Sequence, residues 1–267
     1  MKRIIKLLLL FFAYQLAVTA VCAGLFMWWN HSTEIPGPTS EFYITFLLVV
    51  QVVFTALLST HLIVGKYVTL QRDKQQRFLN QKIWLLSFAL IVGLGLWNNY
   101  LNELADLPNT MEQFLKEMMT HPLGILATVV MAPIMEELLF RGAMQGYLLR
   151  TWKNPMWAII VSSFLFGAVH GNPAQVPFAF VVGLGLGWVY YKTGSLLPCV
   201  FMHFINNASA VLIYWLTNGT KTSLIEACGL QIASVLAVCG VIITALSVVG
   251  MLKCSQEKPV NWYKLQD

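Results

Sequence analysis

Long runs of apolar residues, separated by short polar stretches, constrain the fold of this chain more than any other feature. A helix that crosses the core of a bilayer needs about 20 mostly apolar residues. Charged residues make up only 11% of the 267 residues, whereas an average soluble domain has about 25%. So few charges cannot cover a water-exposed surface, which excludes a soluble globular enzyme. The sequence therefore predicts an all-α, polytopic integral membrane protein.

About eight transmembrane helices are predicted, because eight apolar stretches approach the length of a bilayer crossing. The predicted spans are 4–29, 42–65, 83–101, 122–149, 156–170, 176–191, 196–216 and 230–252. The fifth and sixth are short for full crossings. The first is interpreted as a retained anchor, because it is too long for the apolar core of a signal peptide and ends in tryptophans. We expect a single domain over 1–267, in which 1–101 holds the N-terminal spans, 122–216 the core and 230–252 the last span.

The basic residues fall on one side of the membrane when the predicted spans alternate in direction. Cytoplasmic loops are rich in Lys and Arg. An N-terminus placed inside puts every Lys and Arg on the cytoplasmic side except Lys116, Lys221 and Arg141. Both termini are therefore predicted to be cytoplasmic, and the sizeable loops are a polar linker over 68–82 and an acidic, amphipathic segment over 102–120. The net charge of +5 reflects this basic rim, so no nucleic-acid partner is expected.

Three charged residues remain inside a predicted span, and all three lie in the fourth: Glu136, Glu137 and Arg141. A charged side chain within the membrane is costly and marks a functional site by default. Glu137 and Arg141 are four residues apart, so they share a helix face and can pair. A structural ion pair is the favoured interpretation of these two. Glu136 lies about 100° further around the helix, has no cation nearby on its own helix, and is the favoured general base.

Polar side chains in two later spans complete a candidate site. His170 ends the fifth span, and His203 and Asn207 lie four residues apart on one face of the seventh. A single histidine in a membrane span is more often a hydrogen-bonding group in helix packing. Together with an isolated carboxylate, however, two imidazoles and an amide can activate water and stabilise an oxyanion. The other three histidines lie near loops or span ends and are assigned no role.

Three motifs in this order resemble those of a known family of membrane proteases. They are Glu136-Glu137-x-x-x-Arg141, Phe166-x-x-x-His170 and His203-x-x-x-Asn207. The set is similar to that of the CAAX protease and bacteriocin-processing (CPBP, or Abi) family, intramembrane glutamic endopeptidases related to the Ras-converting CAAX endopeptidase. Each motif alone is weak, but the three together are specific. The resemblance covers about 122–216.

The resemblance implies that Glu136 activates a water for attack on a peptide carbonyl, and that His170 holds and polarises this water. It implies that His203 and Asn207 supply donors to the developing oxyanion, while the ion pair of the first motif supports the geometry. The implied substrate is a membrane-associated protein or peptide, such as a prenylated protein or a leader or signal peptide. No cofactor is expected. The expected location is a bacterial inner or plasma membrane, with the site open toward the cytoplasm.

Four alternatives remain open. A zinc protease can use the same glutamate and histidines, although no His-Glu-x-x-His motif is present, and the five cysteines predict neither a thiolate metal site nor a disulfide framework. A serine protease is disfavoured because no Gly-x-Ser-x-Gly occurs. A transporter needs an unwound span, for which Gly183, Gly185 and Gly187 are candidates, although close helix packing explains these glycines better. The fourth is a non-catalytic immunity or scaffold protein of the same fold.

Overall fold

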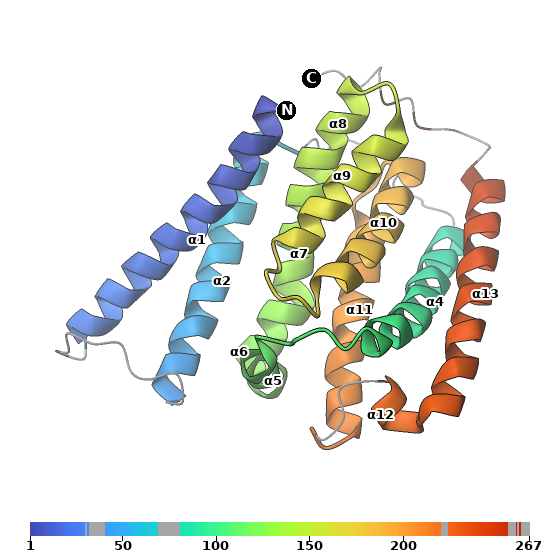
Figure 1. Cartoon of the computed structure of the whole chain (residues 1–267). Coiled ribbons are helices and arrows are strands. Elements are labelled where there is room, and N and C mark those ends of the chain that lie inside the picture. The colour runs from blue at the N-terminus through green and yellow to red at the C-terminus, as the bar shows by residue number, and fades with distance from the viewer. Residues whose placement is uncertain are drawn as a thin grey trace.

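The computed structural model describes residues 1–29, 31, 41–68, 81–219, 224–255, 260 and 262, and Figure 1 shows how they are arranged. In this part of the chain every regular element is helical and no strand occurs, which confirms the all-α prediction. Elements with π-helical hydrogen bonding are labelled η. The elements are α1 Lys2–Trp29, α2 Glu41–Val64, α4 Gln81–Leu104, α5 Glu112–Thr120, α6 Pro122–Ile125, η1 Leu126–Met131, α7 Ala132–Glu136, η2 Glu137–Gln145, α8 Gly146–Thr151, α9 Pro155–Ala168, α10 Val176–Thr193, α11 Leu197–Leu216, α12 Leu224–Cys228 and α13 Leu230–Ser255.

Six helices of the described chain are long and apolar enough to cross a membrane. They are α1, α2, α4, the continuous run from Pro122 to Thr151, α11 and α13. The predicted fifth and sixth spans correspond to α9, with 14 residues, and α10, with 18 residues, which are not among the six. The linker predicted at 68–82 lies, apart from its ends, outside the described residues.

Most of the described basic residues lie toward one end of the bundle, the exceptions being Lys116 in α5 and Arg141 in η2. The first residues of α1, the last residues of α2, α10 and α13, and the turn between α8 and α9 lie toward the upper end in Figure 1, and the first residues of α4 are the upper end of that helix. These positions carry Lys2, Arg3, Lys6, Lys66, Lys82, Arg150, Lys153, Lys192 and Lys253. The helix α5 and the end of α4 lie toward the opposite end, and they carry Glu112, Glu117 and Glu103. Among the described residues, the two ends of the bundle therefore differ in charge.

One long helix lies at the centre of the bundle and carries the charged residues of the fourth predicted span. It consists of α6, η1, α7, η2 and α8, which follow one another without a break from Pro122 to Thr151. Protein buries 56% of its most apolar stretch, against 33% or less in each of the other five long helices. All nine residues of η2 are buried. Because this helix is enclosed by protein, its ionisable groups face other helices instead of lipid.

The remaining helices pack around this centre in pairs. α1 contacts α2, α4 contacts α13, and α9 contacts α10. η2 contacts both α9 and α10, whereas α7 and η1 contact α11, so the three predicted site motifs come from neighbouring helices. α10 is continuous from Val176 to Thr193. The unwound segment that a transporter needs is therefore not found at the glycines of α10.

Candidate active site

The ion pair predicted within the fourth span is present. The Nε atom of Arg141 lies 3.3 Å from Oε2 of Glu137, and both side chains are 0% exposed. Arg141 also donates from Nη2 to the backbone carbonyl of Gly183 at 3.1 Å, and its guanidinium lies 4.5 Å from the ring centre of Phe166. Two charges removed from water are costly unless they are paired and hydrogen-bonded. The contacts of Arg141 thus hold Glu137 in one orientation.

His203 of α11 lies between the two glutamates of the central helix. Its Nδ1 is 3.0 Å from Oε1 of Glu137, and its Nε2 is 3.7 Å from Oε2 of Glu136. A carboxylate paired with Arg141 can only accept, so the geometry assigns a proton to Nδ1 of His203. Nε2 then faces Glu136 across a gap that is longer than a direct hydrogen bond. The partner that Glu136 lacks on its own helix is therefore an imidazole of α11.

Glu136 differs from Glu137 in its surroundings. Its side chain is 17% exposed, whereas that of Glu137 is wholly buried. Oε2 of each glutamate lacks a hydrogen-bond partner among the described residues, but that of Glu137 is paired with Arg141. A carboxylate oxygen with no hydrogen-bond donor of its own can accept a proton from a water beside it. Of the two glutamates, Glu136 therefore has the geometry of a base and Glu137 that of a support.

The ring of Phe166 links His170 to the buried cluster formed by Glu136, Glu137, Arg141 and His203. His170 lies two residues after the end of α9, and its Nδ1 lies 2.8 Å from the backbone carbonyl of Phe166. The carbonyl can only accept, which assigns the proton to Nδ1 and leaves Nε2 as an acceptor. The ring of Phe166 is 5.1 Å from the His170 ring and 5.5 Å from the His203 ring, centre to centre, and edge-to-face with both. Phe166 thus holds both imidazoles around one aromatic side chain.

Asn207 binds the central helix at its first π-helical segment. Its Nδ2 donates to the backbone carbonyl of Thr128 at 2.9 Å. In a π-helix a carbonyl accepts from the amide five residues later, and five residues after Thr128 is Pro133, which has no amide hydrogen. Asn207 therefore satisfies a carbonyl that proline leaves without its backbone partner. Since an amide nitrogen carries two hydrogens, one remains for another acceptor.

The bond from Asn207 predicts a rescue by a second substitution. Asn207→Ala should lower stability by about 1 kcal/mol, because the partly buried carbonyl of Thr128 loses its hydrogen-bond partner. Adding Pro133→Ala supplies the missing backbone amide, so the double variant should regain much of the lost melting temperature. Thermal unfolding of the purified protein in detergent measures both effects, with Pro133→Ala alone as the control. A double variant no more stable than Asn207→Ala would contradict this account of the bond.

The sequence analysis missed one polar residue of this region. Gln145 ends η2, is 0% exposed, and lies four residues after Arg141 and eight after Glu137 on one helix. Its Nε2 donates to the carbonyl of Gly187 at 2.7 Å, and its Oε1 accepts from Oγ of Ser162 at 3.0 Å. The spacing of these three polar residues within an apolar span was the signal that could have identified it.

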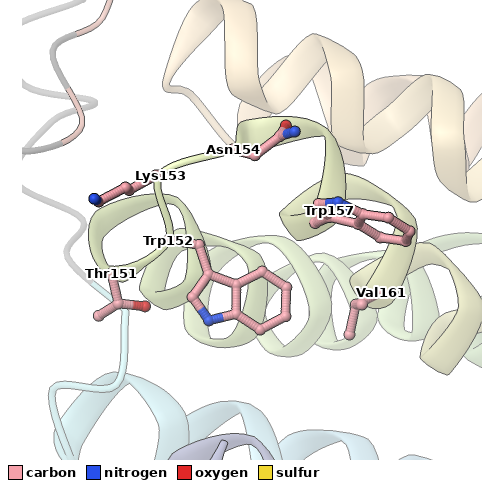
Figure 2. Close-up of a pocket in the computed structure, with 6 residues that line it drawn as sticks. All are labelled: Thr151, Trp152, Lys153, Asn154, Trp157 and Val161. Carbon is pink, nitrogen blue, oxygen red and sulfur yellow. The ribbon is translucent and has the colours of Figure 1, made fainter.

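A surface hollow lies away from this cluster, at the turn between α8 and α9. It has a volume of about 440 Å³ and is lined by Thr151, Trp152, Lys153, Asn154, Trp157 and Val161, as Figure 2 shows. Trp157 is 57% exposed. Tryptophan and lysine at a helix end are typical of the boundary between a membrane and water. We therefore interpret the hollow as part of the membrane interface, and the candidate chemistry stays with the buried cluster.

The comparisons with known proteins concern the same part of the chain. The family "Type II CAAX prenyl endopeptidase Rce1-like" matches residues 119–209, a range that contains all six predicted site residues. Two Bacillus subtilis proteins are similar: "Putative membrane peptidase YdiL", 28% identical over 34% of this chain and 37% of its own length, and "Uncharacterized protein YyaK", 34% identical over 31% of each. The matched region thus spans about a third of the length of these relatives. No solved structure matches the chain. The predicted resemblance to the CAAX protease family is confirmed for residues 119–209.

Proposed function

We propose that this chain is an intramembrane endopeptidase that hydrolyses peptide bonds with a water activated by Glu136. The similarity to CAAX-type membrane endopeptidases supports the reaction class. One observation supports the mechanism above all others. Glu136 places an oxygen without a hydrogen-bond partner 3.7 Å from Nε2 of His203, while the ion pair of Glu137 and Arg141 holds the other side of that ring. This arrangement separates a reactive carboxylate from a supporting one.

The proposed reaction moves one proton twice. Glu136 accepts a proton from a water, and the water oxygen attacks the carbonyl carbon of the peptide bond. Nε2 of His170 accepts a hydrogen bond from the same water and orients it. The charge that develops on the carbonyl oxygen receives hydrogen bonds from an N–H at Nε2 of His203, whose ring lies between the two glutamates, and from the remaining amide hydrogen of Asn207. Glu136 then returns the proton to the amine that leaves, so the base is regenerated.

The membrane orientation is part of the proposal. The basic end of the bundle faces the cytoplasm, both termini lie there, and the whole chain acts as one transmembrane domain of a bacterial inner or plasma membrane. The site opens toward the cytoplasmic side. The substrate is a membrane-associated protein or peptide, such as a prenylated protein or a leader or signal peptide. The name of the Rce1-like family, which refers to prenyl endopeptidases, supports the first of these examples.

The test compares peptides released from membranes that contain the wild-type protein or the variant Glu136→Ala. We expect at least one peptide, or one new terminus of a membrane protein, that depends on Glu136. Mass spectrometry of peptides and protein termini measures this. Immunoblotting must show equal amounts of both proteins in the membrane. Identical peptide profiles at equal protein levels would contradict proteolysis and favour the non-catalytic scaffold or immunity protein.

Chelation separates the proposed mechanism from the zinc alternative. Among the described residues, no three His, Cys, Asp or Glu side chains converge as metal ligands, so the mechanism above uses only the chain's own residues. We expect the Glu136-dependent cleavage to continue in protein that has been freed of metal by a chelator and checked by elemental analysis. Loss of cleavage that zinc restores would instead support the zinc protease.

A further inference from the structure

Two evenly spaced rows of residues meet between η2 and α10. Arg141 and Gln145 are four residues apart on η2, and Gly183 and Gly187 are four residues apart on α10. Arg141 donates to the carbonyl of Gly183 at 3.1 Å, and Gln145 donates to the carbonyl of Gly187 at 2.7 Å. Both bonds join residues 42 positions apart. The two side chains thus form parallel bonds that set how α10 lies along η2.

The absence of a side chain at both glycines allows this close approach. A Cβ atom at position 187 would lie 2.8 Å from Oε1 of Gln145, closer than real Cβ contacts come. A Cβ at position 183 would lie 3.1 Å from both Cδ1 of Phe166 and Cβ of Ser163. The two glycines, which the sequence suggested for close packing, therefore make room for the bonds from η2 and for the neighbouring side chains of α9.

Gln145 is also bound to α9. Its Oε1 accepts from Oγ of Ser162 at 3.0 Å, so the one amide group joins η2, α9 and α10. Ser162 lies one helical turn before Phe166 and two turns before His170. The ring of Phe166 is in edge-to-face contact with both histidines. Gln145 thus binds α9 one turn before Phe166, the residue that contacts both His170 and His203.

We propose that Gln145 is a positioning residue, which fixes α9 against η2 and so places His170 relative to Glu136; this inference rests on the proposed function. The hydrogen bonds of Gln145 go to Ser162 and to the backbone of α10, so its role is exerted through these two partners. A wholly buried amide is costly unless every bond is made. A hydrogen-bonded polar group in a core, however, favours the one arrangement of helices in which its bonds can form. Apolar contacts alone would allow several arrangements.

The test uses Gln145→Met, which keeps the volume of the side chain and removes both bonds. The fold should survive, because Ser162 has a second acceptor in the carbonyl of Ile159 at 3.1 Å, and the carbonyl of Gly187 keeps its place in the α10 helix. A matched control is Tyr100→Phe with Thr244→Val. This pair of substitutions also removes two interhelical bonds, to Ser234 and from Trp97, between α4 and α13, which carry no residue of the cluster.

Two measurements decide the proposal. Hydrogen–deuterium exchange should rise in the C-terminal half of α9 and the turn up to position 175 in Gln145→Met, and not in the control. On the Glu136-dependent substrate, kcat should fall about 10- to 100-fold with KM unchanged, the cost of a misplaced catalytic group, while the control keeps the wild-type kcat. Ser162→Ala should add little to either effect in the Gln145→Met background, because both act through one bond.

The outcomes are distinguishable from those of the proposed function. Unchanged exchange in α9, or a kcat equal to that of the wild type, would overturn the positioning role of Gln145. Equal losses in Gln145→Met and in the control would also overturn it, because they would show a general effect of stability. If no Glu136-dependent product exists, the proposed function fails, and the exchange measurement still decides whether Gln145 fixes α9.

Discussion

Replacing Arg141 by methionine should destabilise the protein by about 3–5 kcal/mol, because the substitution leaves the buried carboxylate of Glu137 without its cation. Both side chains are 0% exposed, so water cannot replace the lost partner. The bond to Gly183 and the contact with the Phe166 ring are lost as well. Since a typical domain is stable by only about 5–15 kcal/mol, most of the variant should be lost before purification or should melt far below the wild type.

A second substitution shows how much of the stability loss in Arg141→Met comes from the unpaired charge of Glu137 and how much from lost packing. Glu137→Gln removes the negative charge and keeps an acceptor for Nδ1 of His203. The double variant of Arg141→Met with Glu137→Gln should therefore regain a large part of the stability that Arg141→Met loses, because replacing both partners of a buried pair is often neutral. Thermal unfolding in detergent and the amount of protein in the membrane measure this. An Arg141→Met protein that melts like the wild type would contradict a structural role of the pair.

The parts of the site that lie on one helix could be predicted from the sequence. Glu137 and Arg141 are four residues apart in an apolar run, so a shared face and a pair follow from helix geometry alone. The central position of their helix also follows, because charged groups in a membrane protein turn away from lipid. The all-helical fold follows from the length of the apolar runs. These are properties of spacing and composition, which do not depend on how helices pack.

The contacts between helices could not be predicted in the same way. Which glutamate binds Nδ1 of His203 depends on the rotation of α11 about its axis, and spacing along either helix leaves this undetermined. The bond from Asn207 to Thr128 depends on the π-helical segment before Pro133, and the sequence analysis expected a regular helix there. Gln145 was missed because an amide carries no charge and did not stand out among the ionisable residues of its span. Each of these contacts is decided by tertiary packing.

Replacing Glu136 by glutamine should have the opposite signature to Arg141→Met, with lost activity and a retained fold. Oε2 of Glu136 has no hydrogen-bond partner among the described residues, and the side chain is 17% exposed. Its one close partner among these residues is Nε2 of His203, at 3.7 Å and so beyond a direct hydrogen bond. Removing the charge of Glu136 therefore costs little pairing energy, and it removes the cost of keeping a carboxylate in an apolar site. The melting temperature should stay the same or rise. Natural active sites often combine such a local cost in stability with function.

The rate of the Glu136-dependent cleavage should fall about 100- to 10,000-fold in Glu136→Gln, because glutamine cannot accept the proton of the attacking water. Purified wild-type and variant proteins in lipid nanodiscs, with the membrane-protein terminus found by mass spectrometry as substrate, allow this measurement. Glu112→Gln is the matched control: it removes the same charge from a surface pair with Lys116 and should leave both rate and melting temperature unchanged. A Glu136→Gln protein that cleaves at the wild-type rate would exclude Glu136 as the base. A variant that also unfolds would place Glu136 among the structural charges, together with Glu137 and Arg141, and would leave the reaction without its proposed proton acceptor.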